Sequence, residues 1–112
     1  MTSLNATERK VFDDVCQEIE DETGSEWCIL ACLDANKYGD PKAFGAYLTH
    51  LQNKELIEIA AYDNGGHGRN RIHGHQIQLT AKGWEIADPT IFDWMDEDAR
   101  ASQIKYFDSW RI

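Results

Sequence analysis

Apolar residues recur with a helical period after Asp40, which is followed directly by Pro41. An aspartate can accept hydrogen bonds from the free N–H groups of a first helical turn, and a proline at the next position loses no required donor. The apolar positions at i, i+3, i+4 and i+7 are Phe44, Tyr47, Leu48 and Leu51. This spacing gathers them into one stripe and predicts a helix over residues 40–53 whose opposite face is small and polar.

Two runs with the alternating pattern of β-strands follow this helix. The alternating apolar residues are Ile57, Ile59 and Ala61 in the first run and Ile77 and Leu79 in the second. Alternation with a period of two predicts strands that each bury one face. The glycine-rich segment between them carries Arg69, Asn70 and Arg71, and it predicts a basic hairpin tip over residues 63–75.

Two further helices are expected in the N-terminal third of the chain. Asn5 is followed three residues later by Glu8, which is the spacing of a capping box, and Gly24 is placed to end the helix that they begin. An uninterrupted apolar run then predicts a short helix over residues 26–34 that is buried on several sides. Because a short glycine-containing turn leads from it into the next helix, the pair has the arrangement of a helix-turn-helix.

The chain after the second strand is also expected to be helical. Thr80 can cap a short helix over residues 81–87 in which Trp84 faces the core. Residues 88–112 carry two amphipathic stripes, which fit two short helices or one bent helix, and they hold five of the twelve aromatic residues. This tail either packs onto the first helix or forms a dimer surface.

The whole pattern predicts one α+β domain over residues 1–87, with three helices and a two-stranded β-hairpin, and a C-terminal helical extension over residues 88–112. No apolar run approaches the ~18 residues of a membrane span and no signal peptide is recognisable. We therefore expect a cytoplasmic protein with no membrane contact. Cys16, Cys28 and Cys32 are an odd number among apolar residues, and we expect them to be small core residues.

The net charge of −9 disfavours a polyanionic partner, but the charges are spread unevenly. Residues 1–26 carry eight acidic and two basic side chains, and residues 84–112 carry seven acidic and three basic ones. Residues 27–83 carry five acidic and six basic side chains together with all four histidines. The predicted helix and hairpin are therefore the least acidic part of the chain.

The spacing of reactive residues predicts neither a metal site nor an enzyme. His73 and His75 would share one face of a strand. This pair supplies only two ligands, whereas a closed zinc site needs about four. Cys28 and Cys32 would lie one turn apart on a helix and form a second pair, but nothing in the sequence brings the pairs together. Glycine-rich phosphate loops and nucleophile elbows are absent, so we expect no cofactor and no catalysis.

Two stretches resemble winged helix-turn-helix regulators. Residues 48–58, LTHLQNKELIE, resemble the end of a recognition helix and the start of a wing. Residues 77–86, IQLTAKGWEI, resemble the strand-to-helix exit that follows the wing in the MarR and PadR families. The separation of the two stretches suits a wing, and the resemblance spans residues 4–87. Glu55 stands where such regulators usually have glycine, because the helix exit there often uses a left-handed backbone.

The resemblance implies a DNA-binding transcriptional regulator that dimerises through its tail. Its recognition helix, residues 40–53, would enter the major groove of double-stranded DNA, and its wing tip would reach the minor groove or phosphates. The candidate DNA-binding residues are Lys42, Ala46, Thr49, Asn53 and Lys54 on or just after the helix and Arg69, Asn70 and Arg71 on the wing. Because cations are few, we expect the two wing arginines to matter most.

Two other functions remain open. The winged helix can serve as a protein-interaction module, such as an adaptor or antirepressor, whose acidic surface repels DNA and meets a basic partner. A third alternative is a metal- or thiol-responsive sensor that uses the cysteines or histidines.

Overall fold

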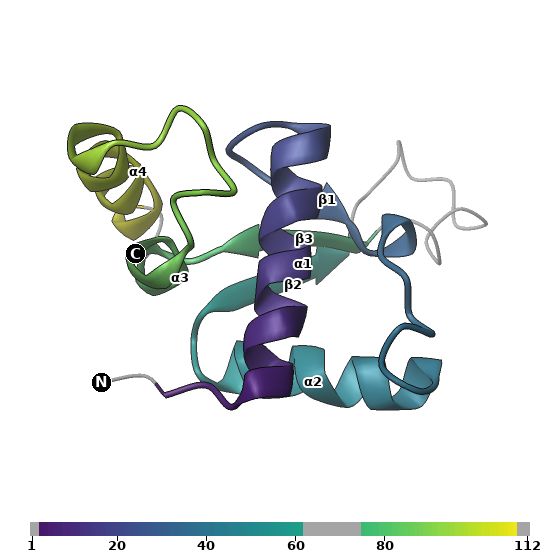
Figure 1. The fold of residues 1–112 in the computed structure, drawn as a ribbon. Helices are drawn as coiled ribbons and strands as arrows, with labels where there is room; N and C mark the ends of the chain where they lie inside the picture. Colours follow the sequence, from purple (N-terminus) through teal and green to yellow (C-terminus); the bar gives the residue numbers. More distant parts are fainter. Residues whose placement is uncertain (1–2, 62–74, 110–112) are drawn as a thin grey trace.

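The computed structural model describes residues 3–61 and 75–109, which form an α+β fold. Its elements in chain order are α1 (Ala6–Glu22), β1 (Cys28–Ile29), the 3-10 helix η1 (Leu30–Cys32), α2 (Pro41–Asn53), β2 (Ile57–Ala61), β3 (His75–Leu79), α3 (Ala81–Ile86) and α4 (Glu97–Asp108). In Figure 1, α1 lies across the sheet, α2 crosses α1 near its N-terminal end, and α3 and α4 stand together at one side. None of the described helices combines the length and apolar composition that crossing a membrane requires.

The three strands form one antiparallel sheet in the order β1-β3-β2. Ile57 of β2 lies opposite Leu79 of β3, so the two predicted strands are confirmed and pair with each other. Cys28 of β1 lies opposite Ile77 on the other side of β3, which makes β3 the central strand. Residues 63–74 of the predicted hairpin tip lie outside the described residues.

The predicted helix over residues 26–34 is wrong. Its first part contains strand β1, which pairs with β3, and its last part contains η1. The hydroxyl of Thr23 accepts hydrogen bonds from the backbone N–H groups of Glu26 and Trp27, at 2.9 and 3.0 Å. These donors are therefore satisfied by a side chain that precedes them rather than by a helical turn. A short apolar run fits a strand and a helix equally well, and pairing with β3 decides in favour of the strand.

The helix ends agree with the capping residues in the sequence. Asn5 and Glu8 form the predicted capping box at the start of α1. Asp40 caps α2 and Thr80 caps α3, each with a side-chain oxygen that accepts a hydrogen bond from the third residue of its helix. Gly24 follows the end of α1 with φ of 83°, the left-handed conformation that terminates many helices.

The exit from α2 is held against the start of α3. Glu55 adopts a left-handed conformation, with φ of 62°, at the position where the resemblance would place a glycine. The hydroxyl of Thr80 donates to the carbonyl of Glu55, and the N–H of Thr80 donates to the carbonyl of Leu56 at 3.1 Å. A Cβ added to Gly83 would lie 2.2 Å from the Leu56 carbonyl oxygen, so a side chain does not fit there. This contact gives a physical reason for the Leu-Thr-x-x-Gly run of residues 79–83.

The core extends from α1, α2 and the sheet to the tail. Its buried apolar residues are Val11, Phe12, Val15, Cys16, Ile19, Cys28, Phe44, Leu48, Leu51, Leu56, Ile57, Ile77, Leu79, Trp84, Ala87, Phe92, Met95 and Phe107. In its described part, residues 88–109, the tail consists of turns followed by one helix, α4, and not of two helices or one bent helix. Its Phe92 and Phe107 pack against Trp84 of α3 at ring-centroid distances of 5.0 and 6.0 Å. The indole N–H of Trp94 reaches the carboxylate of Glu20 on α1 at 3.1 Å, so the tail packs on both helices.

Candidate functional site

The outward face of α2 carries most of the described residues that are predicted to contact DNA. These exposed residues are Lys42, Ala46, Thr49 and Asn53. On the opposite face of the helix, Phe44, Leu48 and Leu51 are buried in the core. The predicted division of α2 into an apolar face and a polar face is therefore confirmed.

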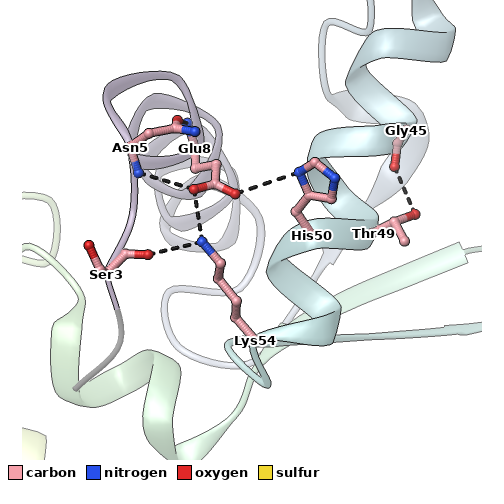
Figure 2. Close-up of polar contacts among 7 residues, drawn as sticks. All are labelled: Ser3, Asn5, Glu8, Gly45, Thr49, His50 and Lys54. Carbon is pink, nitrogen blue, oxygen red and sulfur yellow. Dashed lines mark hydrogen bonds and ion pairs between the residues drawn. The ribbon is translucent and has the colours of Figure 1, made fainter.

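Because Gly45 has no side chain, the backbone of α2 is accessible in the middle of this outward face. A Cβ added at Gly45 would meet no atom within 4 Å, so packing does not require a glycine at this position. A glycine inside a helix costs about 1 kcal/mol relative to alanine, and stability alone would therefore favour alanine here. The hydroxyl of Thr49 donates to the carbonyl of Gly45 at 3.0 Å, which draws this side chain back onto its own helix (Figure 2). With Ala46 alongside, the middle of α2 presents a surface that a partner can approach closely.

Lys54, at the C-terminal end of α2, is engaged within the fold. Its Nζ donates to Oε1 of Glu8 at 2.9 Å and to the carbonyl of Ser3 at 2.9 Å (Figure 2). The side chain of Glu8 is only 6% exposed, and its Oε2 also lies 3.6 Å from Nδ1 of His50. The positive charge of Lys54 is therefore offset by a nearly buried anion. Sequence reasoning identified Glu8 as a capping residue but missed this second role.

Glu8 joins the start of α1 to the end of α2. Its Oε1 accepts the backbone N–H of Asn5 at 3.0 Å as well as the ammonium of Lys54. The hydrogen bond from Asn5, followed by that from Lys54, lowers the pKa of Glu8 below its usual range. Glu8 is therefore ionised at neutral pH, and the nearby charge of Lys54 stabilises this form.

Several other positively charged side chains among the described residues form ion pairs or hydrogen bonds within the fold. Arg9 and Lys37 form ion pairs with carboxylates of α1 at 3.2 and 3.0 Å. Arg9 and Arg100 donate to the carbonyl groups at the C-terminal end of α3 at 2.7 to 3.0 Å. On α2 itself, Lys42 has no ion-pair partner among residues 3–61 and 75–109. The outward face of α2 is therefore polar, with Lys42 as its main source of positive charge.

The remaining predicted site residues are Arg69, Asn70 and Arg71, and they lie outside the described residues. Of the histidine pair considered as metal ligands, His75 is half-buried in β3 and His73 is likewise not described. The cysteines do not lie on one helix as predicted, because Cys28 is buried in β1 whereas Cys32 is exposed at the end of η1. The expectation that all three cysteines belong to the core is therefore wrong for Cys32.

The described residues that could hold a metal ion include one mixed group. Glu18, Glu22 and Cys32 each offer a ligand atom, and these atoms lie within 4.8 Å of one another. This group could not be predicted from residue spacing, because the carboxylates belong to α1 whereas the thiol is brought to them by β1 and η1. Comparison of the chain with protein-family models, curated proteins and solved structures found no match.

Proposed function

We propose that the chain is a winged helix domain that acts as a transcriptional regulator and binds duplex DNA through the outward face of α2. The order α1, β1, α2, β2, β3 supports this proposal, because a winged helix adds an early strand to the hairpin that follows its recognition helix. In this chain η1 stands where the second helix of such a domain would be. The two protein segments that carry the resemblance to MarR and PadR regulators lie at the end of α2 and at the start of α3.

The proposal rests on the outward face of α2, which is exposed and polar and has Gly45 in its middle. Gly45 weakens this helix with no packing contact in return, which is expected where a partner must approach the backbone closely. Thr49 and Asn53 are exposed and can donate or accept hydrogen bonds at base edges or phosphates. Lys42 lies in the first turn of α2, where the helix N-terminus also favours a phosphate group.

The charge of the domain limits the expected affinity. Because Lys54 is paired with Glu8, each subunit offers about three cations to DNA, namely Lys42 and the wing residues Arg69 and Arg71. Three phosphate contacts correspond to a ~40-fold loss of affinity between about 50 and 200 mM salt. A dimer that doubles the contacts would bind more tightly and with a steeper dependence on salt.

Fluorescence anisotropy on random-sequence duplex DNA at about 50 and 200 mM salt tests the proposal. We expect salt-sensitive binding that Lys42→Ala weakens and that the double substitution of Arg69 and Arg71 by alanine weakens further. Lys105→Ala is the matched control, because it removes one exposed positive charge from α4, far from the proposed interface. Absence of binding at the lower salt, or an equal effect of Lys105→Ala and Lys42→Ala, would refute the proposal.

The pairing of Lys54 with Glu8 favours one alternative, a winged helix that binds another protein instead of DNA. In this case the exposed face of α2 would contact a polypeptide, and the acidic side chains of α1 would favour a basic partner. The two functions differ in their response to added charge. An arginine introduced into α2 raises affinity for DNA, whereas it weakens binding to a basic protein surface.

A further inference from the structure

Three side chains that coordinate divalent cations converge where α1 meets the segment before α2. Glu18 and Glu22 lie four residues apart and so face the same side of α1, and Cys32 is the last residue of η1. One ligand atom from each residue lies within 4.8 Å of the other two. In a tetrahedral zinc site, bonds of 2.0–2.3 Å place neighbouring ligand atoms about 3.5 Å apart. Binding would require these side chains to rotate and close the remaining distance, and Glu22 and Cys32 are exposed to solvent.

The two carboxylates at this position have no ion-pair partner within the described chain, and Lys37, which lines the same cleft, pairs with Asp14. In the N-terminal half of α1, Glu8 pairs with Lys54 and the next two acidic residues pair with Arg9 and Lys37, whereas the acidic residues of its C-terminal half form no ion pair within the described chain. Among residues 3–61 and 75–109, neither Glu18 nor Glu22 forms an ion pair. The two carboxylates lie next to each other, with one oxygen of each within 4.8 Å of the other. A bound dication would remove the repulsion between these carboxylates.

The ligand atoms are also oriented and accessible. Oε2 of Glu22 accepts the backbone N–H of Ile29 at 2.9 Å, which fixes the carboxylate in the way that outer hydrogen bonds fix metal ligands. Glu18 and Cys32 line a cleft of about 210 Å³, which leaves room for water to complete the coordination. The thiol of Cys32 hydrogen bonds to Glu22, so these two ligand groups are already in contact. A cation at this position would take the place of the thiol proton, which passes to solvent.

We propose that Glu18, Glu22 and Cys32 bind a zinc ion that ties the C-terminal end of α1 to the 3-10 turn leading into α2. A thiolate with two carboxylates suits zinc, whereas magnesium and calcium bind through oxygen ligands alone. Zinc bound here would brace the segment that positions the outward face of α2. The proposal rests on this cluster and does not depend on whether α2 binds DNA.

Titration of the reduced, metal-free protein with zinc chloride tests the proposal by calorimetry and by thermal unfolding. We expect one saturable site and a rise in Tm on the order of 10 °C when zinc is present at ~100 times its Kd. Cys32→Ser and Glu22→Gln should each weaken binding at least ~10-fold, because each removes a direct ligand. Asp21→Asn is the matched control, since it removes one carboxylate charge beside Glu22 without removing a ligand, and it should retain binding.

Cobalt as a replacement ion gives a second readout that reports on the thiolate directly. A thiolate-to-cobalt absorption band is expected for the unaltered chain and for Asp21→Asn, and it should be lost in Cys32→Ser. Cys32 and Glu22 are exposed, so both substitutions should leave the far-ultraviolet circular dichroism unchanged. The chain also holds four histidines that could bind zinc elsewhere. Zinc or cobalt binding that survives Cys32→Ser unchanged, or no saturable binding at all, would overturn the proposal.

Discussion

Replacement of Gly45 by alanine should make the protein more stable and, at the same time, a poorer partner for DNA. The new Cβ meets no atom within 4 Å, so the substitution introduces no clash. It gains helix propensity of about 1 kcal/mol, because alanine loses less backbone entropy than glycine when α2 forms. Few single substitutions on a protein surface stabilise by this amount.

Urea denaturation followed by tryptophan fluorescence measures this gain. Trp84 is fully buried and therefore reports on unfolding of the core. With an m-value of about 1.5 kcal/mol/M, a gain of about 1 kcal/mol raises the denaturation midpoint by ~0.7 M urea without changing the slope. Ala46→Gly is the matched control on the same exposed face, and it should lower the midpoint by a similar amount.

The same variant tests why a glycine occupies this position. If the backbone of α2 approaches DNA closely at Gly45, the added methyl group will weaken binding in the anisotropy assay while stability rises. Greater stability with unchanged binding would show that the contact does not involve the middle of α2. A loss of stability in Gly45→Ala would refute the reasoning itself, because it would mean that the space around this residue is already filled.

Three further predictions concern the helix junction, pH and charge. Gly83→Ala should lower the free energy of unfolding by at least about 2 kcal/mol in urea denaturation, because its Cβ would lie 2.2 Å from the carbonyl oxygen of Leu56; an unchanged midpoint would contradict the described junction. The pKa of Glu8 is lower in the folded than in the unfolded state, so its contribution to stability is present above the ordinary value of 4.5 and is lost as the pH falls through the lower, folded value. Glu8→Gln should therefore flatten the pH dependence of Tm below pH 4.5, and an unaltered acid slope would count against the pairing with Lys54. Ala46→Arg should raise affinity for random duplex DNA and steepen its salt dependence, whereas Ser102→Arg, an equal charge placed on α4, should do so much less; equal effects would exclude α2 as the interface.

Local chemistry made much of this fold predictable. Each helix start is set by a side chain that accepts hydrogen bonds from backbone N–H groups within three residues of itself, so it can be read from local sequence. These residues are Asn5 with Glu8, Asp40 before Pro41, and Thr80. The faces of α2 and the strands β2 and β3 followed from periodicity, because one side of each element is buried.

The features that sequence reasoning missed depend on residues far apart in the chain. Cys28 belongs to a strand because β3, almost fifty residues later by the sequence numbering, pairs with it, and its apolar neighbours fit a helix just as well. Lys54 was predicted to be a free cation, and only the arrangement of α1 against α2 shows that Glu8 reaches it. The group formed by Glu18 and Cys32 is equally invisible without the path of the chain through η1.

The junction between α2 and α3 gives the molecule a mechanical property. Thr80 bonds to the two residues that end the α2 exit, and Gly83 lies against the same backbone with no space to spare. At its other end, α3 is fastened to α1 by Arg9 and to α4 by Arg100. We therefore expect a tilt of α2 to move α3 and the tail with it. A partner that binds the tail would then also shift the outward face of α2 without touching it.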